Sequence, residues 1–143
     1  LVPDVPPEEA GGLAEEADAA GLATVLFASV TTPDERLRLI GRLTRGFLYC
    51  FAVRGTTGLR DSLARDLAPF MARARSLCEA PLALGLGISN PEQCREAGAM
   101  ADAVVVGSAL VKACMVALDD GGDPALAAGR LAASLRTSLD RRR

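Results

Sequence analysis

The feature that most constrains the fold is an alternation, along the whole chain, of short apolar runs with longer amphipathic segments. The short runs are almost continuously apolar and are interpreted as strands over residues 1–5, 22–29, 47–53, 82–88 and 103–106. Apolar strands separated by helices are typical of a parallel sheet that helices cover on both faces. The pattern therefore predicts an α/β fold, and it fits a parallel barrel as well as an open, doubly wound sheet.

Signals for helix starts support this alternation. Thr32 is expected to cap a helix in which Pro33 is the first residue and Glu35 completes a capping box. Pro69 predicts a kink or a boundary within a helix over residues 63–78. Other helices are expected to begin after Val5, after Asn90, after Gly107-Ser108 and after Asp123.

The composition excludes several classes of function. The chain has 143 residues, half of them apolar, and a formal net charge of −2, so it can bury a core but offers no basic surface for nucleic acid. Cys50, Cys78, Cys94 and Cys114 form no C-x-x-C pair and there is no histidine, which argues against a metal site. We interpret the cysteines as buried thiols in a reducing compartment. No apolar run approaches the roughly 20 residues of a membrane span and no basic leader opens the chain, so a cytoplasmic protein is expected.

Glycine-rich segments follow the last two predicted strands, at the end where ligands bind in both α/β architectures. Gly85-Leu86-Gly87 follows the fourth predicted strand, and Gly107-Ser108 follows the fifth and opens a helix. Glycine lets backbone N–H groups approach an anion, and a helix N-terminus adds unpaired donors and a favourable dipole. The two segments together predict a phosphate site, although close packing of strand and helix or a simple helix cap explains either segment alone.

The other strand ends carry fewer chemical groups. Residues 55–58, with a glycine at each end, favour a mobile flap over the site, the alternative being a turn. Ser29 and Thr31 follow the second predicted strand, and Asp4 is the only carboxylate that follows a strand. Tyr49, the only tyrosine, lies within a strand and either faces the site or packs in the core. The residues alone thus predict anion binding without a pair of groups for acid–base catalysis.

Four stretches occur in a characteristic order: LVPDVPPEE, RGFLYCFAVRGTTG, LGLGISNPEQ and VVVGSALVK. In this combination the chain resembles tryptophan synthase alpha chains over essentially its whole length. The resemblance implies a (β/α)₈ TIM barrel, of which this chain is the C-terminal half with strands 4–8, as one partial domain over residues 1–143. It also implies cleavage of indole-3-glycerol phosphate to indole and glyceraldehyde 3-phosphate, with indole passing to a beta chain that holds pyridoxal phosphate. The alpha chain itself is expected to need no cofactor.

The resemblance also assigns roles to particular positions. Tyr49 matches a residue of the substrate pocket, Thr57 matches the flap threonine, and Arg54 departs from the family pattern just before the flap. The segment Asp4-Val5-Pro6 matches a loop near the beta-chain interface. The positions that surround the substrate phosphate are matched by Gly58, Gly85, Leu86, Gly87, Gly107 and Ser108.

The family's two catalytic carboxylates, a Glu and an Asp, belong to the N-terminal half of the barrel and match no position here. A full barrel needs about 250 residues. We therefore expect no catalytic residue in this chain and negligible lyase activity from it alone. An open half-barrel exposes two strand edges, so the isolated chain is expected to be loosely folded, to dimerise, or to need the missing half.

Two alternatives remain open at the level of sequence. One is another phosphate-binding barrel, such as a phosphosugar isomerase or epimerase, which shares the late glycines. The other is a non-catalytic half-barrel that binds phosphate or a partner subunit, which the lack of an acid–base pair favours.

Overall fold

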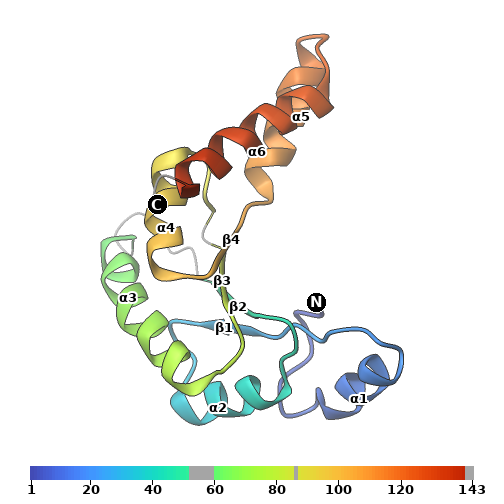
Figure 1. Ribbon diagram of the computed structural model, residues 1–143, viewed down its shortest axis with the longest axis vertical. Coiled ribbons are helices and arrows are strands. Elements are labelled where there is room, and N and C mark those ends of the chain that lie inside the picture. Colours follow the sequence, from blue (N-terminus) through green and yellow to red (C-terminus); the bar gives the residue numbers. More distant parts are fainter. Residues whose placement is uncertain (52–59, 86, 141–143) are drawn as a thin grey trace. The chain divides into compact units, whose positions relative to one another are not determined.

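The structure is a computed structural model that describes residues 1–51, 60–85 and 87–140 (Figure 1). Its four strands form one sheet in the order β1-β2-β3-β4, and β1 pairs in parallel with β2, Phe27 opposite Tyr49 and Ser29 opposite Phe51. The elements follow one another as α1 (Gly11–Ala19), β1 (Phe27–Ser29), α2 (Asp34–Leu43), β2 (Leu48–Phe51), α3 (Arg60–Leu77), β3 (Leu82–Gly85), α4 (Pro91–Met100), β4 (Ala103–Val105), α5 (Ser108–Asp119) and α6 (Pro124–Asp140).

The chain divides into two compact units, which are described separately. The first unit comprises Leu1–Leu84 and Ala101–Ala103. Its core lies on the face of the sheet that carries Leu48 and Cys50, and it includes Leu37 of α2 and Phe70 of α3, all of them buried. Helix α2 packs against both β1 and α3. Each large apolar side chain buried in this way contributes about 1.5–3 kcal/mol to the stability of the unit.

The second unit comprises Gly85–Met100 and Val104–Arg143. Helix α6 packs against α4 and α5, with Cys94, Ala97 and Leu135 buried. Gly98 lies so close to the Leu139 side chain that a β-carbon there would displace it. Helix α5 has no buried residue, and several of its apolar side chains are exposed.

The alternation predicted from the sequence is confirmed, but several details were wrong. Residues 1–5 form turns and a bend instead of a strand, and Leu1 and Val2 are exposed. The structure therefore contains four strands within its described residues, not five. The strand predicted over residues 22–29 is short, because only Phe27–Ser29 pairs with β2.

The predicted cap of α2 was wrong, and Pro69 is not the boundary of its helix. The residue before α2 is Pro33, with an extended ψ of 156°, and no side chain caps the helix. Thr32 cannot act as the cap because its Oγ1 atom accepts a hydrogen bond from the Ser29 N–H instead, at 2.9 Å. Pro69 lies inside α3, and the helix continues through it to Leu77. The starts predicted at Asn90, Gly107-Ser108 and Asp123 are confirmed.

No helix among the described residues is long and apolar enough to cross a lipid bilayer.

Candidate functional site

The turn between β3 and α4 is shaped by a glycine and closed by a polar cap. Gly87 has a φ of +63°, which only glycine adopts at little cost, and the next residue, Ile88, is buried. Asn90 Oδ1 then accepts a hydrogen bond from the Gln93 N–H at 3.0 Å, and Gln93 Oε1 accepts one from the Ser89 N–H at 2.9 Å. These paired bonds fix the direction in which the chain leaves Gly87 and enters α4.

Gly107 stands directly before α5 and has open space around it among the described residues. An added β-carbon would meet none of their atoms within 4 Å, and the φ of −121° is open to any residue. Its carbonyl accepts hydrogen bonds from the Leu110 and Val111 N–H groups, at 2.9 and 3.2 Å. Within the described residues, no side chain caps this helix, so the N–H groups of Ser108 and Ala109 remain available to an anion.

An aromatic cluster lies on one face of β1 and β2. The Tyr49 and Phe27 rings lie 5.1 Å apart, and Phe27 meets Phe51 edge to face at 6.4 Å. All three side chains are half-buried, whereas Leu48 and Cys50 on the opposite face are fully buried. Tyr49 therefore belongs to the open face of the sheet. The sequence analysis did not single out Phe27 and Phe51. The alternation of side chains along β2 would have placed Phe51 on the same face as Tyr49, whereas Phe27 belongs to β1 and its position depends on the strand register.

The segment predicted to meet a partner lies over this open face. A cavity of about 270 Å³ extends between residues 3–7 and β1, and Asp4, Val5 and Pro6 all line it. The aromatic wall is provided by Phe27 and Phe51, and the polar positions include Ser29, Thr32 and Arg36. Arg36 is also paired with Glu8 at 2.7 Å, and this contact lowers the pKa of the Glu8 carboxyl.

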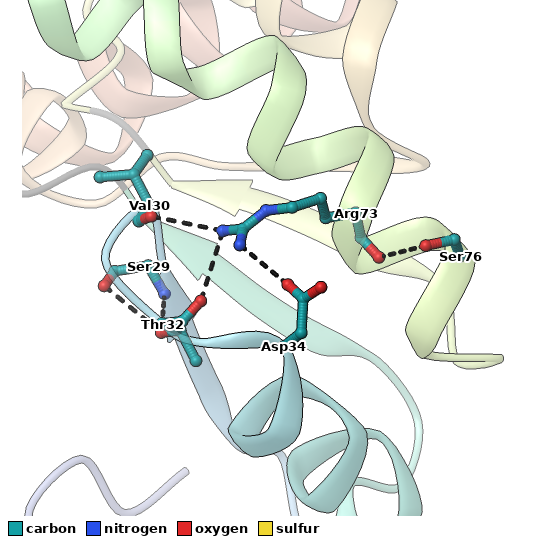
Figure 2. Close-up of polar contacts among 6 residues, drawn as sticks. All are labelled: Ser29, Val30, Thr32, Asp34, Arg73 and Ser76. Atoms are coloured by element: carbon teal, nitrogen blue, oxygen red, sulfur yellow. Dashed lines mark hydrogen bonds and ion pairs between the residues drawn. The ribbon is translucent and has the colours of Figure 1, made fainter.

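The loop between β1 and α2 carries a hydrogen-bonded group of hydroxyls (Figure 2). Ser29 Oγ and Thr31 Oγ1 are 2.9 Å apart, and Thr32 accepts from the Ser29 N–H through its side chain. Arg73 of α3 reaches this loop, pairing with Asp34 at 2.9 Å and donating to the carbonyl of Thr32 at 3.3 Å. The sequence singled out Ser29 and Thr31 but gave no signal for Arg73.

The structure groups the remaining predicted site residues by unit. Gly85, Gly87, Gly107 and Ser108 belong to the second unit, and Tyr49 with residues 4–6 belongs to the first. The positions Arg54, Thr57, Gly58 and Leu86 lie outside the described residues, as does most of the predicted flap. A larger hollow of about 530 Å³ between α4 and α6 contains none of the predicted positions.

No acid–base pair or metal site emerges in the part of the chain that the structure describes. Groups of three or more potential metal ligands do not occur there. The ion pairs of Asp34, Asp102 and Glu8 each join a surface carboxylate to an arginine. These contacts have the exposure expected of surface salt bridges, not of catalytic carboxylates.

Parallel strands alternating with helices place the chain in the α/β class. Glycines at the carboxyl ends of the later strands are common in the (β/α)-barrel proteins of this class. A family model described as "Tryptophan synthase alpha chain" matches residues 1–134. The chain belongs to the tryptophan synthase alpha chain family. This membership confirms the resemblance seen in the sequence and makes another phosphate-binding barrel family the weaker alternative.

Individual relatives agree with this assignment. The chain is 43% identical over 123 residues to the tryptophan synthase alpha chain of Phenylobacterium zucineum, covering 86% of this chain and 44% of the relative. It is 40% identical over 139 residues to that of Pelobacter propionicus, covering 97% and 51%. Among solved structures, the tryptophan synthase alpha chain of Legionella pneumophila matches with a TM-score of 0.84 at 30% identity, over 97% of this chain and 50% of that chain. The chain thus spans about half the length of these relatives, as a half-barrel.

Proposed function

We propose that this chain provides the phosphate-binding part of an enzyme that cleaves indole-3-glycerol phosphate to indole and glyceraldehyde 3-phosphate in tryptophan biosynthesis. The observation that carries the proposal is the open approach to Gly107 at the start of α5. Neither φ nor packing against the described residues requires glycine at this position. A phosphate that approaches the backbone closely does require it, since any side chain would stand in its way.

The geometry at the start of α5, in the second unit, supports the proposed phosphate contacts. The N–H groups of Ser108 and Ala109 point out of the first turn of α5, where the helix dipole favours an anion. The Ser108 hydroxyl adds a further donor. We assign Gly85, Leu86, Gly87 and the flap positions Gly58 and Thr57 to the same phosphate through their match to the family pattern, with Arg54 beside the flap.

The first unit offers an aromatic surface of its own. The cluster of Phe27, Tyr49 and Phe51 provides an aromatic surface that is only half-buried and suits a flat indole ring. Aromatic rings stack or meet edge to face at the spacings seen in this cluster, and burial of one more ring is favourable.

We assign the bond-breaking groups to another part of the complete barrel. Proton transfer to the indole ring and from the glycerol hydroxyl needs a positioned acid and base. The family's Glu and Asp match no position among these residues, so we expect this chain alone to be inactive. We further propose that Asp4, Val5 and Pro6 face a tryptophan synthase beta chain, which holds the pyridoxal phosphate. We propose the cytoplasm as the compartment of the assembly.

Binding and activity together test the proposal. In calorimetric titrations, the chain should bind indole-3-propanol phosphate more tightly than inorganic phosphate or a pentose phosphate. Indole release should be negligible from the chain alone and should appear when the N-terminal half of the Pelobacter propionicus relative is added. Preference for the pentose phosphate would contradict the proposal, and so would indole release at enzyme-like rates without the added half.

A second candidate is a non-catalytic module that binds phosphate or a partner subunit. The observation that favours it is the lack of a carboxylate pair within the described residues. Co-purification with a beta chain, with no indole release even after addition of the N-terminal half, would support this candidate over the enzyme.

A further inference from the structure

The loop that follows β1 has a closed, hydrogen-bonded conformation. The Thr32 N–H donates to the Ser29 carbonyl at 2.9 Å, and the Ser29 N–H donates to Thr32 Oγ1 at 2.9 Å. These reciprocal bonds turn the chain sharply and bring the Ser29 and Thr31 hydroxyls within 2.9 Å of each other. Ser29 is only 7% exposed, so its hydroxyl has a fixed direction.

Ser29 of this hydroxyl pair borders the cavity between residues 3–7 and β1. Ser29 is opposite Phe51 in the strand register and lies two residues from Phe27, so the three side chains share one face of the sheet. Ser29, Phe27 and Phe51 all line the 270 Å³ cavity, and Thr32 of the same loop lines it too. The loop thus places polar groups beside the two aromatic rings of the cavity.

Arg73 holds the outer side of the same loop (Figure 2). Its Nη2 atom donates to the carbonyls of Val30 and Thr32, at 3.4 and 3.3 Å, while Nη1 pairs with Asp34 at 2.9 Å. One guanidinium therefore connects α3 to two loop carbonyls and to the first turn of α2. The planar, multiply donating guanidinium suits this arrangement, and a single ammonium group cannot reproduce it.

We propose that Arg73 is a positioning residue for the aryl end of the substrate site: it fixes the β1–α2 loop and thereby the Ser29 hydroxyl, which lines the cavity beside Phe27 and Phe51. The inference rests on the proposed function for the identity of the ligand. Arg73 itself is not among the residues that line the cavity, so it acts through the Val30 and Thr32 carbonyls.

Three variants of the full chain separate positioning from simple stability. R73A removes the ion pair and both carbonyl contacts. R73K keeps a positive charge that can pair with Asp34, but it lacks the planar guanidinium that donates to the carbonyls of Val30 and Thr32. R75A is the matched control, because Arg75 lies two residues further along α3 and forms a similarly exposed ion pair with Asp102 at 3.1 Å.

Two measurements are made on each variant. The first is the affinity for indole-3-propanol phosphate and, separately, for inorganic phosphate. R73A and R73K should bind the aryl phosphate about tenfold more weakly, a loss of the size expected when hydrogen bonds that orient a site are removed. Affinity for inorganic phosphate should be unchanged. R75A should match the wild type for both ligands, and R73K should keep the wild-type unfolding midpoint.

The second measurement is hydrogen exchange at the Ser29 and Thr32 amides, both of which are hydrogen-bonded within the loop. Both should exchange about tenfold faster in R73A and R73K than in the wild type or R75A. Equal aryl-phosphate affinity in wild type and R73A, or unchanged exchange at both amides, would overturn the inference. If the wild type itself binds neither phosphate, the proposed function fails, and the exchange rates alone decide whether Arg73 fixes the loop.

Discussion

Two positions of the predicted phosphate site carry glycine for different physical reasons. Gly87 adopts a left-handed φ of +63°, which a side chain would strain. Gly107 has a negative φ and open space around its α-carbon, so its own fold does not require glycine. Folding thus accounts for glycine at position 87, and the proposed binding of phosphate accounts for glycine at position 107.

We therefore expect opposite outcomes from the two alanine variants. G87A should lower the free energy of unfolding by about 1–2 kcal/mol, because alanine is forced into the left-handed region. G107A should cost only about 0.5 kcal/mol, the difference between glycine and alanine before a helix. Phosphate binding should nevertheless weaken at least tenfold in G107A. Denaturant unfolding and calorimetric titration measure the two effects. Wild-type phosphate affinity in G107A would contradict the role proposed for this glycine.

Asp102 gives a prediction about pH. Its Oδ2 atom accepts a hydrogen bond from the buried Leu82 N–H at 2.8 Å and pairs with Arg75 at 3.1 Å. The hydrogen bond from the Leu82 N–H is the main cause that lowers the pKa of the Asp102 carboxyl, and Arg75 lowers it further. Because the folded pKa is depressed, the stabilisation is present above the unfolded value of about 3.9 and is lost as pH falls through the folded pKa.

Since the Asp102 carboxylate is partly exposed, D102A should cost only about 1 kcal/mol at pH 7. D102N should cost less, because the amide oxygen still accepts from Leu82. Urea unfolding at pH 7 and at pH 3 measures the effect. The difference between wild type and D102A should shrink at the lower pH, and a constant difference would disprove the linkage.

Cys50 should be chemically inert in the folded chain. Burial raises the pKa of its thiol to about 12, so only about one thiol in ten thousand is ionised at pH 8. Cys114 is the one cysteine that is not buried. Timed alkylation with iodoacetamide, read by mass spectrometry, should modify Cys114 first and Cys50 only after unfolding. Rapid labelling of Cys50 in the native chain would show that this part of the core opens readily.

At the scale of elements, helix starts were predictable where a side chain close in sequence supplies the cap. Asn90 and Asp123 each accept hydrogen bonds from N–H groups two or three residues ahead, as their sequences indicate. The start of α2 was misplaced by one residue, because Thr32 bonds back to Ser29 and Arg73 holds its carbonyl. Arg73 lies 41 residues from Thr32 in the chain, so no local sequence pattern indicates this contact.

The cap of α4 gives a prediction at this scale. N90A removes the acceptor for the Gln93 N–H and should cost about 1 kcal/mol. N90D should restore most of the loss, because a carboxylate also accepts this bond and favours the helix dipole. Thermal unfolding of the three proteins measures this order. Equal stability of N90A and the wild type would mean that the cap is satisfied by water.

At the scale of the molecule, α5 presents an apolar stripe on the surface. Val111, Met115 and Leu118 follow one another at positions i, i+4 and i+7, and each is about 60% exposed. Strands β1 and β4 are the edges of the four-stranded sheet, and unpaired edges favour association. Both features lead us to expect that the chain on its own associates with itself.

Light scattering coupled to size-exclusion chromatography should show dimers or larger species at roughly 0.1 mM, a concentration at which exposed apolar surface commonly associates. Replacement of Val111, Met115 and Leu118 by glutamine should shift the chain toward monomer without loss of helical signal. K112Q, on the same helix, should leave association unchanged. A wild-type chain that stays monomeric at this concentration would contradict the expectation.

The sequence by itself determined the alternation of strands and helices and the family, and it supplied the glycines that we propose for a phosphate site. These features depend on residues that are neighbours in the chain: continuous apolar runs, caps within three residues, and glycine at a strand end. Tertiary structure alone decided where β1 begins, that residues 1–5 form no strand, and that Phe27 of β1 lies opposite Tyr49 of β2. Only the tertiary structure revealed the role of Arg73. Its guanidinium donates to the Thr32 carbonyl, 41 residues earlier in the chain, because α3 folds back over the β1–α2 loop.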